Sequence, residues 1–581
     1  MDPGPTHDPR RLSAERLALA QTATLRAGLF LLPLAYSPFT YDQFVLPKLL
    51  LARLLVAVLA ILFLARVVST RTVFIKRTPV DIPLLVFLAS AALSSVFAEN
   101  QNIALFGTYS RYDGLLTLAT FIALFWLSVQ SITDRSEAHV LVRVLLASGY
   151  TVGVVAIIQS IHDSVALGLI TPAFGSLGNP NVLGSFLALV IALGFGELLA
   201  ARSMTTRVLL LNVLVVAGLA LLLSFSRSSW FATGIAAVFI LVTRPERRKL
   251  IGVVVPLLAA LMVTLAIGYV VAVSGPLGSR FAGRVATLVN PSTAVGSRFG
   301  IWTDSLRLIA SRPLLGYGPD NVGLVFPRFQ TGDWGVTKEG IRQQIDKAHL
   351  EVLQVAATQG IVGLAAHLYL LAAFIVTFWR ARRMDQALLF AAGWIAYETV
   401  IQLNFTSLAS AFPFWIFSAA AMVSCDAARS RSIDIDRGRA FVGLGGVVAA
   451  GLAVAMWGAI VPYLADVRLR EAVDADYAGR HREAQILAAD ARRLEPQESV
   501  YAVEVGNTAF ELGEWSAART GYRDAASLGT FNPLVYRNLG LADRNLGFRT
   551  EGREAALKAV ELDRFDPANQ ALLAEFEVGT R

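Results

Sequence analysis

The chain has 581 residues, of which 55% are hydrophobic and only 16% are charged, whereas a soluble globular chain carries about 25% charged residues. This composition excludes an ordinary soluble enzyme. The formal charge of +8 does not indicate nucleic-acid binding, because residues 466–581 hold 15 basic and 20 acidic side chains and the positive excess lies in the apolar part. The single cysteine, Cys425, and six scattered histidines disfavour a disulfide framework and a zinc site.

Apolar segments of about 20 residues, long enough to cross roughly 30 Å of hydrocarbon, recur as far as residue 463. They predict thirteen membrane spans, at 27–36, 49–65, 82–98, 115–131, 140–161, 182–200, 208–223, 230–242, 250–273, 350–379, 387–403, 412–424 and 441–463. The polar segment 1–26 has no signal-peptide cleavage pattern, so we expect it to stay in the cytoplasm. We therefore expect an all-α polytopic domain at 27–464, with about 12–13 transmembrane helices.

The positions of Lys and Arg orient these spans, because cytoplasmic loops retain positive charge. With the N-terminus inside, the predicted inner loops carry nineteen Lys or Arg residues and the short outer loops carry only Lys48, Arg111 and Arg227. The same alternation places the long loop 274–348 outside, together with the tail that follows the thirteenth span. The basic residues are thus explained by membrane topology.

The tail repeats itself at an interval of 34 residues. Gly479, Gly513 and Gly547 share this spacing, as do Pro533 and Pro567. Glycine at an inner turn and proline at the end of a 34-residue unit resemble the tetratricopeptide repeat, a helix hairpin that stacks into a binding surface. A plain helical bundle is the alternative. We expect residues 465–581 to form a repeat domain that binds a protein partner and performs no chemistry.

Two polar motifs in the predicted outer loops favour a structural role. Arg111 lies in the segment 107–114, ahead of the fourth span. Asn181 follows Asn179-Pro180 at the start of the sixth span and is expected to cap that helix. Turns and caps need such residues whether or not a ligand binds.

Three further features indicate a binding site more directly. Arg227 lies in a tight turn without an acidic neighbour within ten residues, so it needs an anion, and lipid phosphate is an equally good candidate. The outer loop carries Arg298 and Trp302. It ends at Asp346 and His349, beside Glu351. A lone histidine at a helix start is more often a cap than a catalyst.

These motifs together resemble the O-antigen ligase and polymerase superfamily of bacterial polytopic glycosyltransferases, over about residues 25–425. The superfamily signature comprises a Ser-Arg turn, Arg-x-x-x-Trp, Pro-x-x-Gly-x-Gly-x-x-Asn and Asp-x-Ala-His-Asn. In this chain they read Ser226-Arg227, Arg298 to Trp302, 313–321, and Asp346 to Leu350. The last position departs from the usual Asn, and Glu351 offers an acceptor one residue further on. Many relatives also end in tetratricopeptide repeats.

The resemblance implies a C-type glycosyltransferase-like fold in the bacterial inner membrane, with the large loop and the repeats outside the cytoplasm. It also implies transfer of a glycan from a polyprenyl diphosphate, such as undecaprenyl diphosphate, to an acceptor hydroxyl. In this mechanism Arg227, Arg298 and Arg111 bind the diphosphate and His349 is the base. Asp346, Glu351, Asn181 and Trp302 are expected to support them.

No cofactor is expected. The acidic residues of the outer loop form no Asp-x-Asp pair, so arginine is expected to take the place of a metal ion. The acceptor, whether glycan, lipid or protein, is left open, as is the choice between ligase and polymerase. The competing hypotheses are a transporter or flippase of lipid-linked glycans, and a membrane scaffold that presents the repeats. No nucleic-acid partner is expected.

Overall fold

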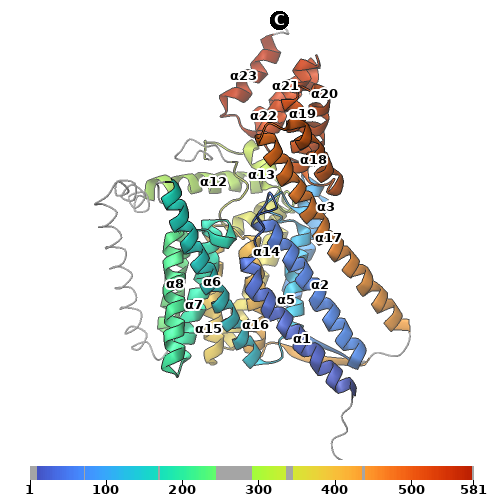
Figure 1. Cartoon of the computed structure of the whole chain (residues 1–581). Coiled ribbons are helices and arrows are strands. Elements are labelled where there is room, and N and C mark those ends of the chain that lie inside the picture. The colour runs from blue at the N-terminus through green and yellow to red at the C-terminus, as the bar shows by residue number, and fades with distance from the viewer. Residues whose placement is uncertain are drawn as a thin grey trace, which may run out of the picture.

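The computed structural model describes residues 9–70, 72–167, 171–243, 291–334, 344–434 and 439–578. Its helices form a bundle, with a smaller helical array beyond one end (Figure 1). The elements of the bundle and its loops are α1 (Pro9–Leu31), η1 (Leu32–Leu34), α2 (Val45–Thr70), β1 (Thr72–Arg77), α3 (Asp81–Val96), α4 (Gln101–Phe106), α5 (Leu115–Ser131), α6 (Arg135–Leu167), η2 (Gly175–Leu177), α7 (Pro180–Ala200), α8 (Met204–Leu223), α9 (Arg227–Thr243), α12 (Pro291–Ser311), α13 (Val322–Val325), η3 (Phe326–Arg328), α14 (Glu351–Arg380), α15 (Asp385–Gln402), α16 (Leu408–Ser424) and β2 (Arg429–Asp434). The remaining elements are α17 (Arg439–Tyr477), α18 (His481–Leu494), α19 (Ser499–Glu511), α20 (Trp515–Ser527), α21 (Pro533–Asn545), α22 (Arg549–Leu562) and α23 (Pro567–Val578).

The helices of the bundle follow the apolar segments of the sequence. Each predicted span within the described residues coincides with a helix, while the predicted span 250–273 lies outside them. Six candidate membrane spans are long and apolar enough to cross a bilayer, in α1 to η1, α2, α6, α7, α8 and α14, and α3, α5, α9 and α16 are shorter apolar helices. The predicted fold class, an all-α polytopic membrane protein, is confirmed.

The first span begins earlier than predicted. Its candidate boundaries are Ala14–Leu34, so most of the segment 1–26 belongs to a helix. Leu25 and Leu29 are buried against the bundle, and Arg26 forms an ion pair with Glu137 at the start of α6. An arginine with a carboxylate partner is tolerated in an apolar helix. The charge of Arg26 therefore does not mark the start of the first span.

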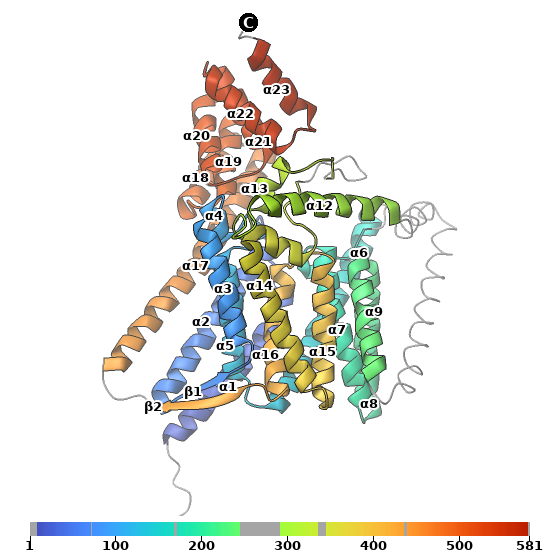
Figure 2. The same ribbon diagram turned by 180° about the vertical axis from the view of Figure 1, so that it is seen from behind.

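A short antiparallel sheet was not predicted. Strands β1 and β2 come from two different basic loops and pair from Thr72 with Asp434 to Arg77 with Arg429. The sheet lies at the end of the bundle opposite the helical array (Figure 2). The pairing shows that these two predicted inner loops share one side of the bundle.

Helix α7 lies at the centre of the bundle, packed between α6, α8, α9 and α15. In its apolar window 89% of the residues are buried. Gly184 allows close contact with α9, because a Cβ atom there would lie 2.3 Å from Ser229 Oγ. This contact fixes the turn that carries Arg227.

Beyond the other end of the bundle, α12 lies across the helix ends, beneath the array (Figure 2). The turn before α9, the segment 107–114 and the start of α14 are at this same end. The charge distribution predicted that these segments, the loop 274–348 and the tail lie on one side of the membrane. The described parts of all of them lie at one end of the bundle.

The C-terminal array consists of helix hairpins with the predicted 34-residue period. Helices α18, α20 and α22 begin at His481, Trp515 and Arg549. The three matched glycines precede these helices with φ between 70° and 80°, a conformation that glycine adopts without steric cost. The first hairpin uses the end of α17, which runs unbroken for 39 residues. The predicted boundary between domains, at 464 and 465, thus falls inside one continuous helix.

Candidate active site

The turn before α9 lies at the same end of the bundle as the array, and Arg227 begins the helix there (Figure 2). Phe225, in the left-handed region at φ 52°, reverses the chain before the helix begins. Ser226 Oγ donates to Asn181 Oδ1 at 3.0 Å and lies 2.9 Å from Ser229 Oγ. The Arg227 side chain is exposed and has no hydrogen-bond or ion-pair partner among the residues that the structure describes. The local hydroxyl groups hydrogen-bond to one another and to Asn181, and they do not bind this guanidinium.

Asn181 has a different role from the one predicted. The N-cap of α7 is Asn179, whose side chain accepts from the backbone N–H of Asn181 at 2.8 Å. Pro180 occupies the first helical turn, where its missing N–H costs nothing. The prediction that Asn181 caps the helix is therefore wrong, and its side chain instead holds the Ser226 turn.

Helix α12 carries Arg298 and Trp302, one turn apart. Arg298 donates to the carbonyl oxygen of Leu403 at 2.8 Å and has no carboxylate partner among the described residues. Burial and the neighbouring Arg227 guanidinium lower the pKa of Arg298. The Trp302 ring contacts Phe299 at 5.3 Å between centroids, and its buried Nε1 has no partner in the described part of the chain. Arg227 therefore lies near enough to Arg298 for their like charges to repel each other.

The third predicted arginine is neutralised within the protein. Arg111 donates to Asp346 at 2.7 Å and lies over the Phe405 ring at 5.3 Å. Burial lowers the pKa of Arg111, but the Asp346 carboxylate outweighs this and raises it. Arg111 therefore positions Asp346 in this structure, and an anionic ligand would have to compete with that carboxylate.

Next to Asp346, Lys347 is buried between two carboxylates. Its Nζ lies 2.7 Å from Asp113 and 2.9 Å from Asp320, and the Lys347 side chain is only 4% exposed. Asp320 also accepts from the Thr108 N–H at 2.7 Å and from Thr108 Oγ1 at 2.8 Å. Burial raises the pKa of Asp113 to about 6 although Lys347 opposes the shift. This cluster joins the segment 107–114, the loop 313–321 and the segment before α14.

His349 follows this anchored segment in a constrained conformation. Its φ of 52° is left-handed, which is uncommon for a residue with a side chain. The Ala348 N–H donates to Gln354 Oε1 at 2.8 Å, so the chain is held on both sides of the ring. The ring packs edge-on against Phe405 at 5.6 Å, with Asn404 beside it. Burial and the nearby Arg298 lower the pKa of His349, and its buried Nδ1 has no partner among the described residues.

The segment 313–321, singled out for its glycine pattern, shapes the start of α14. The helix breaks at Gly360, with φ 64° and ψ −162°. The backbone of the segment binds at this break, with the Gly318 N–H donating to Thr358 O at 2.8 Å and the Ile361 N–H to Pro313 O at 2.8 Å. Asn321 accepts from the Asn100 N–H at 2.9 Å. The motif is therefore structural and directs the first turns of α14 toward the site.

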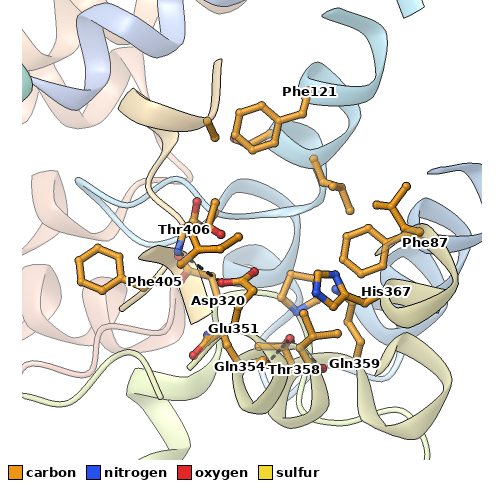
Figure 3. Close-up of a pocket in the computed structure, with 18 of the residues that line it drawn as sticks. Phe87, Phe121, Asp320, Glu351, Gln354, Thr358, Gln359, His367, Phe405 and Thr406 are labelled. Atoms are coloured by element: carbon orange, nitrogen blue, oxygen red, sulfur yellow. Dashed lines mark hydrogen bonds between the residues drawn. The ribbon is translucent and has the colours of Figure 1, made fainter. Parts of the chain in front are cut away.

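A cavity of about 160 Å³ lies between α3, α5, α14, α15 and α16. Glu351, Gln354, Thr358 and Gln359 line one wall along α14, opposite the rings of Phe87 and Phe121 (Figure 3). Glu351 accepts from the Thr406 N–H at 3.3 Å. The other polar residues that line the cavity include Asp113, Asp320, Lys347, His367, Tyr397, Glu398 and Thr406. The cavity thus combines carboxylates and amides with aromatic rings.

The loop between α15 and α16, which was not predicted, supplies several contacts of the site. Its residues are Leu403, whose carbonyl binds Arg298, Asn404 and Phe405 beside His349, and Thr406, which binds Glu351. Lys347 was also missed. Its place between Asp346 and Ala348 in a recognised motif was a usable signal, whereas the α15–α16 loop has no distinctive pattern.

The structure brings seven of the eight predicted residues into one connected group. Arg227 and Asn181 meet at the Ser226 turn, and electrostatic contacts run from Arg227 to Arg298 and from Arg298 to His349. Phe405 joins His349 to Arg111 and through it to Asp346. Glu351 faces the cavity. Trp302 shares α12 with Arg298 but makes no contact with the other predicted residues among the interactions described. In the described ranges, no group of three or more His, Cys, Asp or Glu side chains is arranged to hold a metal ion.

Residues 212–368 match the family model described as O-Antigen ligase. The region contains Arg227, Arg298, Asp346 and His349, so the resemblance drawn from the motifs is confirmed for this part of the chain. A search of curated proteins finds no match.

Two solved structures are each similar to 20% of this chain. One is the first TPR of Spaghetti (RPAP3) bound to the HSP90 peptide SRMEEVD, with 17% identity over 93% of that chain and a TM-score of 0.20. The other is the NMR structure of the first TPR domain of the human RPAP3 protein, with 18% identity over 94% of that chain and a TM-score of 0.20. The helical repeat described above rests on the chain's own helices.

Proposed function

We propose that this multi-pass membrane protein transfers a glycan from a polyprenyl diphosphate donor, such as undecaprenyl diphosphate, to an acceptor hydroxyl. The observation that carries the proposal is that two arginines, which have no carboxylate partner among the described residues, lie near a buried histidine at one end of the bundle, within the region that matches the O-Antigen ligase model. The reaction is a displacement at the anomeric carbon, with the lipid diphosphate as leaving group.

Arg227 and Arg298 bind the diphosphate in this proposal. Negative charge accumulates on the leaving diphosphate in the transition state, and guanidinium groups hold phosphate oxygens through paired, charge-assisted hydrogen bonds. The repulsion that lowers the pKa of Arg298 is removed when an anion lies between the two groups. Arg111, which pairs with Asp346, contributes by position more than by direct contact.

His349 is the base that removes the proton from the acceptor hydroxyl. A base must be unprotonated at the working pH, and burial together with Arg298 favours the neutral imidazole. The unpartnered Nδ1 leaves a ring nitrogen available for the proton. Where relatives commonly have Asn after this histidine, the chain has Leu350, and we assign the amide's role to Asn404, which lies beside the ring.

The cavity on the other side of the Lys347 segment receives the acceptor. Its carboxylates repel a diphosphate, whereas carboxylates and amides such as Glu351 and Gln354 bind sugar hydroxyls. The buried His367 Nε2 and Glu398 Oε2 have no partner among the described residues, so two further polar atoms await a ligand or water. An acceptor with exposed hydroxyl groups fits this lining.

The acceptor decides between a ligase and a polymerase of surface polysaccharide, and a lipid, glycan or protein acceptor is compatible with the cavity. Placement in the bacterial inner membrane, with the site and the repeats outside the cytoplasm, agrees with the charge distribution and with their common position at one end of the bundle. A flippase or a scaffold for the repeats would leave the convergence of Arg227, Arg298 and His349 without a purpose.

The test separates donor binding from chemistry in the full chain, purified in mild detergent. Undecaprenyl diphosphate is the binding probe, and transfer is followed with lipid-linked glycan extracted from membranes. We expect Arg227→Gln and Arg298→Gln each to weaken probe binding at least tenfold, while His349→Ala abolishes transfer and leaves binding intact. Arg202→Gln, an exposed arginine between α7 and α8, is the matched control. Unchanged binding in both arginine variants, or transfer by His349→Ala, contradicts the proposal.

A further inference from the structure

A second and larger cavity, of about 1010 Å³, lies in a different part of the membrane domain. Its walls are α2, α5 and α17, and the connection between α18 and α19 closes one end. Small residues make the space, among them Ala57, Ala60, Ala119, Ala123 and Gly458. The lining along α2 and α5 is otherwise almost entirely apolar.

The arrangement of the helices opens this cavity toward the bilayer. Helix α17 lies against α2 near the array but diverges from it toward the other end of the bundle (Figure 2). The space lies between the candidate membrane span α2, the shorter apolar helix α5 and helix α17, and we call it the α2–α17 groove. Hydrocarbon fills such a groove in a bilayer, because its apolar walls offer water no partners.

Arg53 stands at the polar end of the α2–α17 groove. Arg53 lies inside the candidate span Val45–Thr70, is partly buried, and makes only a long contact of 3.4 Å with Gly458 O. No carboxylate lies within ion-pair distance of Arg53 among the described residues. An arginine within a membrane span is costly and is retained where an anion or a polar cavity receives it.

The neighbouring acidic residues do not neutralise Arg53 fully. Glu495 and Glu498 lie on the connection that closes the groove, and burial raises the pKa of each to about 7, although Arg53 opposes the shift at Glu495. Neither glutamate forms an ion pair with Arg53 in the described part of the chain, and each is only partly ionised at neutral pH. Arg493, at the same end, already pairs with Asp490 at 2.7 Å.

We propose that the α2–α17 groove binds one anionic phospholipid, with its acyl chains along α2 and α5 and its phosphate on Arg53. The hydrophobic walls match the chains, and the Arg53 guanidinium, which has no carboxylate at ion-pair distance among the described residues, matches the phosphate. The polyprenyl donor is not the occupant, because α9, which begins at Arg227, lies on the opposite side of the bundle from α2 and α17 (Figure 2). The lipid joins the membrane helices to the first repeats through the residues at 495–498, and this role is independent of the catalytic proposal.

The experiment uses the full chain, reconstituted with phosphatidylglycerol and phosphatidylethanolamine and then measured by native mass spectrometry in mild detergent. We expect one retained phosphatidylglycerol per chain, with retention reduced at least tenfold in Arg53→Gln. Arg66→Gln is the matched control, because Arg66 lies on the same helix and its guanidinium lies over the Phe63 ring, outside the lining of the groove. Equal retention in Arg53→Gln and the parent overturns the proposal, as does equal retention of the two phospholipids or displacement by undecaprenyl phosphate.

A second measurement covers the case in which Arg53→Gln fails to fold. Ala123→Phe fills the groove without touching Arg53 and should also remove the lipid. Trp457 lines the groove and is 72% exposed, so brominated phosphatidylglycerol should quench the part of the fluorescence that Trp457→Phe removes. Absence of that quenching in the parent chain, or lipid retention in Ala123→Phe, contradicts the assignment.

Discussion

Replacing Lys347 by methionine tests whether the buried cluster holds His349 in place. The substitution keeps the length of the side chain but leaves Asp113 and Asp320 facing each other without their shared cation. Removing one partner from a buried ion pair costs about 3–5 kcal/mol, because the other charge loses its compensation. Lys347 is 4% exposed, so water cannot replace it.

The loss of the Lys347 ion pairs should also affect the position of His349, because the two residues lie on the same short backbone segment. The left-handed conformation of His349 costs about 1–2 kcal/mol, which the contacts on both sides of the residue compensate. Without Lys347 the segment can relax toward an extended conformation. A penalty of about 3 kcal/mol corresponds to roughly a hundredfold fall in the fraction of chains that keep the ring in position. We therefore expect transfer to fall about a hundredfold while binding of undecaprenyl diphosphate is retained.

The assay compares thermal unfolding of the purified chain, probe binding and transfer in the parent and the variants. Lys558→Met is the control, since Lys558 forms a partly exposed pair with Glu561 in the repeats and should cost less than about 1 kcal/mol. The double variant Lys347→Met with Asp113→Asn should recover part of the stability, because the remaining Asp320 still accepts two hydrogen bonds from Thr108. Parental stability and transfer in Lys347→Met would refute the reasoning.

Further predictions concern the helix break, the base, the metal and the array. Gly360→Ala should destabilise the chain by at least about 2 kcal/mol, because the added Cβ would lie 2.2 Å from Leu314 O at a position with positive φ. Gly218→Ala is the control and should be neutral or stabilising, because its Cβ would have no atom within 4 Å. Equal unfolding curves for the two variants would contradict this prediction. Because the pKa of His349 is lowered from its usual 6.5, its neutral form persists at neutral pH. As the pH is lowered, transfer should therefore decline only below pH 6.5, and a decline that begins above pH 7 would exclude His349 as the base. Transfer should continue at its full rate in a chelator, and full dependence on added Mg²⁺ would contradict the role of the arginines. Asp466→Ala should increase protease cleavage between bundle and array, because this carboxylate accepts from the Tyr109 hydroxyl at 2.5 Å; an unchanged cleavage rate would refute it.

The helices were predictable because their signal is local. The segment 115–131 was predicted as a span and is the helix Leu115–Ser131, since the apolar run follows a glycine and ends before polar residues. The 34-residue period likewise has a local cause, the left-handed turn that each matched glycine provides. The first span was predicted too late, because the pairing of Arg26 with Glu137 joins residues 111 positions apart.

The contacts that organise the site could not be predicted for the same reason. Lys347 meets Asp113 across 234 positions, and Arg298 meets Leu403 across 105. No periodicity connects such residues, and only the superfamily motifs indicated that Arg227, Arg298 and His349 belong together. Those motifs could not show that Arg111 is already paired with Asp346, or that Asn404 lies beside His349.

The array is held in a fixed position over the site rather than joined to it by a linker. Helix α17 continues from the bundle into the first hairpin, and Arg328, the last residue of η3, pairs with Glu561 in α22 at 2.8 Å. A polar cavity of about 320 Å³ lies between the outer loop and the repeats, and Gln344 and Ile345 form part of its wall. These two residues directly precede Asp346 and the segment that carries His349. A ligand bound between loop and repeats is therefore held within a few residues of the proposed base, which gives the repeats a direct physical route to influence transfer.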